Sequence, residues 1–154
     1  MLKFLTIATL VSHALVAGTF FAFSTFIMSA LGKGEPSQAI RAMQSINSTI
    51  LSSPFMVAFG ASTLLSIALP FVAKFSGERS WSPYLIVVLV LSVVGVFLVT
   101  TAGNVPLNNQ LDAVKAPYTA SQWDDYARSW LVWNHIRTAA GVVAIACLSL
   151  FLSK

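Results

Sequence analysis

The last apolar stretch of the chain opens with three side chains that are unusual inside a membrane, namely Asn134, His135 and Arg137. Polar and ionisable groups are costly at membrane depth, so they are candidates for function. A histidine can act as a general base, and a guanidinium beside an amide can stabilise an oxyanion. Structural alternatives stay open, because Arg137 could extend to the lipid headgroups and Asn134 could simply bond a neighbouring helix.

A second polar side chain, His13, lies in the first apolar stretch. His13 and His135 are the 2 histidines of the chain. A helical rise of about 1.5 Å per residue puts both near the middle of the bilayer, which permits a shared metal or haem site. Two histidines cannot complete a zinc site, which usually has about four ligands. The alternative is that each histidine hydrogen-bonds within the bundle. The sequence does not identify a cofactor, and the protein could bind haem or no cofactor.

Four apolar segments of membrane-spanning length must position these groups. They cover roughly residues 4–31, 55–73, 84–102 and 130–152, and a membrane-spanning helix needs about 20 residues. Of the 154 residues, 56% are hydrophobic and only 9% are charged, against about 25% charged in soluble domains. Residues 1–154 are therefore expected to form a single transmembrane domain, an all-α integral membrane four-helix bundle.

An additional amphipathic helix is predicted over residues 37–51. Its apolar side chains share one face, and polar side chains occupy the rest of the surface. The apolar face comprises Ile40, Met43, Ile46 and Ile50. Such a helix lies in the membrane interface or caps the bundle.

The remaining connections differ in length. Residues 76–80 predict a short polar turn, so the second and third spans should be antiparallel neighbours. Residues 103–109 predict an irregular, amide-rich loop. Ser121 and Asp124 resemble a capping box, which would start the last helix near Gln122.

An even number of spans places both termini on one side of the membrane. Lys3, Lys74, Arg79 and Lys154 would share that side, and Lys33, Arg41, Lys115 and Arg128 the other. Each side thus carries four basic residues, and their count does not decide the orientation. The terminal amine and the short tails favour placing both termini in the cytoplasm. We expect a multi-pass protein of the bacterial inner membrane with both termini cytoplasmic.

The expected partners follow from the same composition. The net charge is +4, but the sequence has no cluster of consecutive Lys and Arg residues. Nucleic acid is therefore not an expected partner. The lipid bilayer and a lipophilic small molecule are expected partners, and a homo-oligomer stays open.

Several segments together carry a resemblance to a known family. They are residues 17–24, 42–47, Val99 with Thr100, residues 104–109, and Trp123, Tyr126 and Trp130 with residues 133–138. Over nearly its whole length the chain is similar to the small four-helix membrane proteins that include the fungal anthrone oxygenases, largely a domain-of-unknown-function family. The closing Trp-Asn-His-Ile-Arg-Thr is the most specific part. Residues 28–31 depart from the pattern, since a proline is expected after Met28, and this affects helix shape rather than chemistry.

The resemblance implies a membrane oxygenase, or monooxygenase, that oxidises anthrones to anthraquinones with dioxygen, although many bacterial members have no assigned substrate. In this scheme His135 removes a proton from the carbon between the rings. Arg137 and the amide of Asn104, Asn108 or Asn134 stabilise the resulting oxyanion. The expected substrate-binding residues are Asn104, Asn108, Trp133, Trp130 and Phe20. We expect Arg137, Asn134 and Asn104 to face the bundle interior, and His135 to matter most.

Three functions stay open at the level of sequence. The first is an oxidoreductase, a membrane oxygenase acting on a lipophilic, aromatic, anthrone-like substrate. The second is a haem- or metal-binding membrane protein that uses His13, His135 or both for electron transfer or sensing. The third is a non-enzymatic bundle that binds a small molecule.

Overall fold

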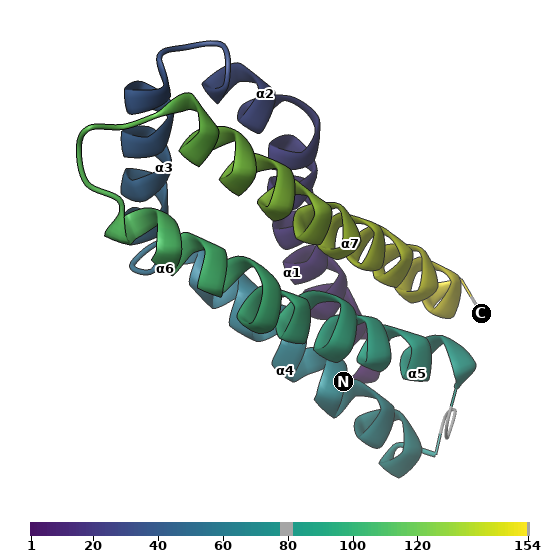
Figure 1. Cartoon of the computed structure of the whole chain (residues 1–154). Coiled ribbons are helices and arrows are strands. Elements are labelled where there is room, and N and C mark those ends of the chain that lie inside the picture. Colours follow the sequence, from purple (N-terminus) through teal and green to yellow (C-terminus); the bar gives the residue numbers. More distant parts are fainter. Residues whose placement is uncertain (78–81, 154) are drawn as a thin grey trace.

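The computed structural model describes residues 1–77 and 82–153, and its described part is helical without strands (Figure 1). Four helices are long and apolar enough to cross a membrane: Leu2–Leu31, Pro54–Phe75, Pro83–Ala113 and Ala120–Leu152. The expected all-α bundle with four long apolar helices is therefore confirmed. Most of the polar turn expected at residues 76–80 lies outside the described residues, but the helices on either side of it do pack together.

Two of the long helices are interrupted by π-helical turns. The first consists of α1 (Leu2–Ala22), η1 (Phe23–Ile27) and α2 (Met28–Leu31). The third consists of α5 (Pro83–Val90), η2 (Leu91–Leu98), η3 (Thr100–Asn104) and α6 (Val105–Ala113). The other helices are α3 (Pro36–Ile50), α4 (Pro54–Phe75) and α7 (Ala120–Leu152). Turns of π-helix are rare and often occur at functional sites.

The long helix α7 packs against α1, η2 and α5, and α1 also packs against α4. Two glycines allow the closest approaches. A Cβ at Gly141 would lie 2.8 Å from the Cβ of Ala17, and one at Gly95 would lie 2.7 Å from the Cβ of Ala140. Small residues of this kind let membrane helices approach closely, and here they draw α1, η2 and α7 together in the middle of the bundle.

Apolar side chains fill both ends of the bundle. Figure 1 shows both termini at the end opposite α3. At the terminal end, Leu69, Leu85 and Leu148 are fully buried together. At the other end, Ile40 and Met43 of α3 pack with aromatic residues of α7.

The amphipathic helix α3 caps one end of the bundle. Ile40 is 0% exposed and Met43 is 2% exposed, whereas Arg41 lies on the opposite, exposed face. The amide of Gln44 donates a hydrogen bond to the carbonyl of Leu111 at 2.8 Å, near the end of α6. The helix is therefore part of the core, and the expected amphipathic face is the face that it buries.

The amide-rich segment at residues 103–109 is helical, which corrects the expected irregular loop. Pro106 lacks a backbone N–H, but it lies in the first turn of α6, directly after the π-helical η3. A proline is tolerated there because the helix register has already changed. As a consequence Asn104 and Asn108, four residues apart, lie on one helix face.

The start of α7 also differs from the expectation. The capping box is formed by Thr119 and Gln122, and not by Ser121 and Asp124. The backbone N–H of Gln122 donates to Thr119 Oγ1 at 3.4 Å, and the N–H of Thr119 donates to Gln122 Oε1 at 2.9 Å. Glutamine at the third helical position fits this motif, and the helix begins at Ala120.

Candidate functional site

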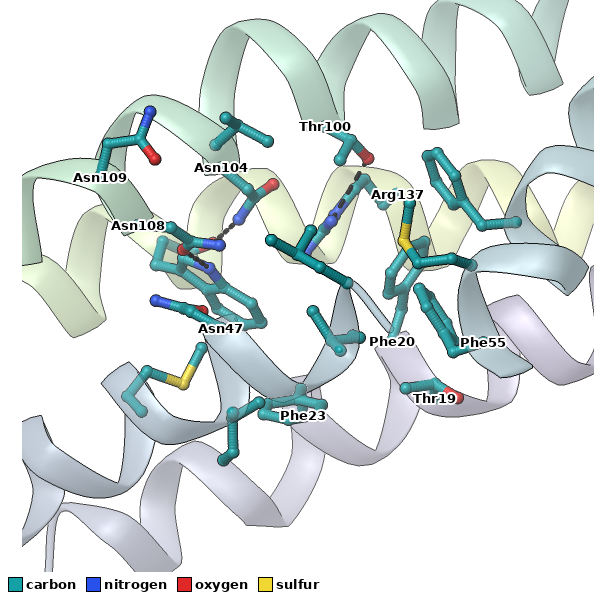
Figure 2. Close-up of a pocket in the computed structure, with 18 of the residues that line it drawn as sticks. Thr19, Phe20, Phe23, Asn47, Phe55, Thr100, Asn104, Asn108, Asn109 and Arg137 are labelled. Atoms are coloured by element: carbon teal, nitrogen blue, oxygen red, sulfur yellow. Dashed lines mark hydrogen bonds between the residues drawn. The ribbon is translucent and has the colours of Figure 1, made fainter. Parts of the chain in front are cut away.

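A cavity of about 240 Å³ lies where α1, α3, α4, η3, α6 and α7 converge (Figure 2). Aromatic and aliphatic side chains form most of its wall, and the lining residues include the exposed Leu51, Met56 and Val105. A mostly apolar hollow with a few convergent polar groups is typical of small-molecule sites. Its volume is slightly below the usual lower bound of about 300 Å³, which suits a compact ligand.

Arg137 is the charged group buried in the wall of this cavity, and it is only 5% exposed. Its NH2 donates to Asn134 Oδ1 at 2.7 Å, and its NH1 donates to Thr100 Oγ1 at 3.3 Å. The centre of the guanidinium lies 4.1 Å from the ring centroid of Phe20 and 5.3 Å from that of Trp130. These contacts place the cation over two aromatic rings, a favourable cation–π arrangement.

No carboxylate among the described residues forms an ion pair with Arg137. A buried charge without a partner of opposite sign is costly, and burial is tolerated when a counter-charge is supplied. The cavity therefore favours a ligand that presents an anionic or strongly accepting oxygen to Arg137.

Asn134 holds Arg137 in place and is itself fully buried. Its Nδ2 donates to the carbonyl of Phe20 at 2.8 Å and to Ser24 Oγ at 2.7 Å. A carbonyl can only accept, so this contact fixes which end of the amide is nitrogen. The Oδ1 atom is thereby directed at Arg137, and α1 and α7 are joined at the level of the cavity.

Two further amides connect the third long helix to α7. Asn104 Nδ2 donates to the carbonyl of Trp130 at 3.1 Å. Asn108 Oδ1 accepts from Tyr126 OH at 3.0 Å and from Trp130 Nε1 at 2.9 Å. These bonds hold the Trp130 ring in the cavity wall.

Two buried polar atoms of the site lack a hydrogen-bond partner in the described part of the chain. They are Arg137 Nε, a donor, and Asn104 Oδ1, an acceptor. Buried polar atoms in proteins are nearly always bonded, so each exception needs an explanation.

The structure brings most of the candidate residues together. The expected interior placement of Arg137, Asn134 and Asn104 is confirmed by their burial. Asn108, Trp130 and Phe20 also line the cavity, together with Arg137 and Asn104.

Two candidates lie elsewhere. His135 is exposed and is not among the cavity-lining residues, because it follows Asn134 by one position and an α-helix turns about 100° per residue. Trp133 is 39% exposed and also lies outside the cavity. Its ring packs on Gly103, where a Cβ would lie 2.6 Å away. The expectation that His135 meets a ligand beside Arg137 is not matched by this geometry.

His13 is buried but lies apart from the cavity. Its Nδ1 donates to the carbonyl of Thr9 at 3.0 Å, and its Nε2 lies 2.8 Å from Ser92 Oγ. Ser92 Oγ is in turn 3.0 Å from Ser66 Oγ. Both ring nitrogens are thus engaged, and a metal or haem iron would have to displace one of these partners.

The two histidines do not form a shared site, since His13 is buried and His135 faces outward. In residues 1–77 and 82–153, no group of three or more His, Cys, Asp and Glu side chains is arranged to hold a metal ion.

Several lining residues were not singled out from the sequence. Phe55 stacks on Phe59 at 6.1 Å, and Phe20 meets Phe55 edge-on at 5.9 Å. The four-residue spacing of Phe55 and Phe59 at the start of α4 was the available signal. Thr100, which accepts from Arg137, belongs to a segment that had carried the family resemblance but had no assigned role.

The chain matches a known protein family. The model of the family described as anthrone oxygenase matches residues 42–147, which is more than half of the chain and includes α4, η3, α6 and most of α7. Neither the curated proteins nor the solved structures give a significant match. The matched segment contains Asn104, Asn134 and Arg137. This chain belongs to the anthrone oxygenase family.

Proposed function

We propose that this protein is a membrane oxygenase that binds a compact, lipophilic aromatic ketone in the cavity and stabilises its anion with Arg137. The observation that carries the proposal is a buried guanidinium without a carboxylate partner in the described residues, set against the aromatic wall of a cavity. Membership of the anthrone oxygenase family supports an oxygenase-type activity.

The chemistry begins with an acidic C–H group. In an anthrone, the methylene between the two aromatic rings loses a proton to give an enolate that is delocalised over the ring system. Arg137 would stabilise the enolate oxygen more strongly than the neutral ketone oxygen, and such differential stabilisation is what promotes ionisation. The anion would also supply the counter-charge that Arg137 lacks.

The proton needs an acceptor, and His135 does not line the cavity. The carboxylate among the lining residues belongs to Asp112, which is exposed and lies 3.4 Å from the amide nitrogen of Asn47. We assign Asp112 the role of passing the proton to solvent at the polar end of the cavity.

The electron-rich anion then reacts with dioxygen. Over the whole reaction the methylene loses two hydrogens, one oxygen atom becomes the new ketone oxygen, and the other leaves as water. The apolar wall would admit both a flat aromatic ring and dioxygen. The protein's part in this scheme is to bind the ring, favour the anion and exclude water.

The experiment that tests this proposal is a turnover assay on the purified protein in nanodiscs, with anthrone and ¹⁸O₂. Formation of anthraquinone faster than in empty nanodiscs, with one labelled oxygen in the product, is the expected result. Arg137→Met should remove the excess rate. Arg128→Met is the matched control, because Arg128 is an exposed arginine of the same helix, 3.9 Å from Asp125.

The same observations also favour a second function, a non-enzymatic binder of lipophilic anions. In that case anthrone or an aromatic anion would bind in an Arg137-dependent way without any excess turnover. Failure of the wild-type protein to bind either ligand would overturn both functions.

A further inference from the structure

We infer that the cavity opens sideways to the lipid bilayer, through a lateral mouth between α4 and the start of α6, and that its ligand enters and leaves by this route. The mouth is bordered by Leu51, Met56 and Val105, which line the cavity. Figure 2 shows Phe55 and Thr100 on opposite sides of the cavity, on the two long helices that flank the mouth. The inference rests on the proposed function in one respect, because it takes the ligand to be lipophilic and to bind in this cavity.

The three bordering side chains are apolar, and they are also exposed at the outer surface. Leu51 is 71% exposed, Val105 is 40% exposed and Met56 is 37% exposed. A side chain that contributes both to the cavity wall and to the outer surface lies where the two meet. Exposure of large apolar groups is unfavourable in water and not in lipid, so the opening that these residues border faces the bilayer.

The mouth lies at the edge of the hydrocarbon core, on the side of α3. Phe75 ends α4 and Pro83 begins α5, and these two helices pack together, so both residues lie at the opposite edge. A hydrocarbon core takes up about 20 helical residues, which reach from Phe75 back to Met56 and from Pro83 forward to Gly103, just before Val105. Aromatic rings with a polar group favour this depth, because the polar group stays among the headgroups.

Hydrogen bonds close the cavity on the headgroup side of the mouth. Gln44 Nε2 of α3 donates to the carbonyl of Leu111 at 2.8 Å and to that of Val114 at 3.3 Å. Asn47 Nδ2 donates to Asp112 Oδ1 at 3.4 Å. A ligand that passed between α3 and the end of α6 would have to break these bonds.

An aromatic contact closes the deep side of the mouth. Phe59 of α4 stacks on Phe97 of η2, with the ring centroids 6.2 Å apart. Between this stack and the bonds of α3, residues 51–58 and residues 98–109 form their hydrogen bonds elsewhere in the described chain and none with each other. No bond between the two segments has to break for a ligand to pass, and rotamer changes of the flexible Met56 side chain can widen the mouth.

The first test obstructs the mouth with tryptophan, a side chain that suits the membrane interface. Stopped-flow fluorescence gives the association and dissociation rate constants of 9-anthracenecarboxylate with the protein in nanodiscs. In Met56→Trp and in Val105→Trp both rate constants should fall about tenfold and the dissociation constant should change less than about threefold, because an obstructed route slows entry and exit alike. Val57→Trp is the matched control with wild-type rates, since Val57 is the exposed neighbour of Met56 and does not line the cavity.

The kinetic pattern separates a blocked route from a damaged site. Damage to the site would mainly raise the dissociation rate constant, because affinity changes within one site are mostly changes in dissociation. Asn109→Trp supplies the opposing case, since Asn109 is an exposed lining residue on the headgroup side. Slower rates in Asn109→Trp, with wild-type rates in both mouth variants, would place the route at the headgroup side and overturn the inference.

A second test needs no ligand. Val105→Cys, in a Cys147→Ala background, is labelled with bimane, and its fluorescence is quenched by iodide from water or by phospholipids that carry a spin label near the headgroup. Quenching by lipid should dominate at this position. A label at Ser48→Cys, exposed on α3, should respond mainly to iodide.

The two tests separate the inference from the proposed function. Iodide quenching at Val105→Cys as strong as at Ser48→Cys would show a mouth open to water and overturn the inference alone. Failure of the wild-type protein to bind 9-anthracenecarboxylate would contradict the proposed function, and the bimane measurement would still decide whether the mouth faces lipid.

Discussion

Two buried polar clusters lie in one bundle, and they differ in how completely their hydrogen bonds are satisfied. The His13 cluster consists of His13, Ser66 and Ser92, and every buried side-chain nitrogen and oxygen in it has a partner. The Arg137 cluster consists of Arg137, Asn134 and Asn104, and it contains an unpaired donor and an unpaired acceptor beside the cavity.

This comparison separates two uses of polar groups at membrane depth. A satisfied network joins helices, because each donor and acceptor contributes to packing and none remains for a ligand. An incompletely satisfied network beside a hollow retains the capacity to bind. Polarity inside a membrane therefore identifies candidates, and the number of unpaired buried atoms separates the candidate site from the structural contact.

The largest effect is expected for Arg137→Met, measured by fluorescence titration in nanodiscs with 9-anthracenecarboxylate as the anionic probe and anthracene as the neutral one. Affinity for the anion should fall about 100-fold, since a charge-assisted hydrogen bond contributes about 1.5–3 kcal/mol. Affinity for anthracene should stay the same. An equal loss for both probes would show that Arg137 supports the cavity shape and does not recognise charge.

The opposite pattern is expected for His13→Leu. The free energy of unfolding should fall by about 1–3 kcal/mol, because Ser92 and the carbonyl of Thr9 lose buried partners. Affinity for 9-anthracenecarboxylate should change less than about twofold, since His13 lies outside the cavity. Thermal or SDS-induced unfolding together with the same titration measures both quantities. A strong loss of binding in a folded His13 variant would remove the distinction between the two clusters.

A smaller effect is expected when the Arg137 cluster is given the counter-charge that it lacks. Asn134→Asp places a carboxylate where Oδ1 now accepts from Arg137 at 2.7 Å. Affinity for the anionic probe should fall about tenfold, because the guanidinium would already be neutralised. Ser24→Ala is the control, since it removes one of the two contacts of Asn134 Nδ2 without adding charge. Unchanged anion affinity in Asn134→Asp would argue against charge pairing as the basis of binding.

The smallest effect is expected for His135→Gln. Both anion affinity and anthrone turnover should stay within about twofold of the wild-type values, because His135 is exposed and does not line the cavity. Loss of turnover with retained folding would instead return His135 to the role of general base that its motif had indicated.

The sequence was informative where the physics is local. Apolar length predicted four spans and a helical bundle, because backbone groups in lipid must be satisfied within each helix. The apolar face of residues 37–51 predicted the helix whose Ile40 and Met43 are now buried. The cost of a cation in lipid predicted that Arg137 and Asn134 turn inward, and their burial bears this out.

The candidate site was predicted only in part, because the direction of each side chain depends on its rotational position on the helix. Asn134 and His135 are adjacent in sequence, yet about 100° of helical rotation places one in the interior and the other outside. Residues 103–109 contain amides and a proline that favour a loop, but packing against α7 and the change to π-helix keep them helical. Asn104 and Asn108 consequently lie on one face, which a loop would not have ensured.

What the sequence determined by itself is the class of protein and the presence of costly polar groups in its spans, because hydropathy and helix length are properties of each segment alone. Only the tertiary structure decided which of these groups remain unpaired. Arg137, Asn104 and the Phe20 ring come from three different long helices, and a hydrogen bond or a missing one depends on distances between helices. The cavity, the uncompensated cation and the free acceptor of Asn104 therefore exist only once α1, η3 and α7 are packed together.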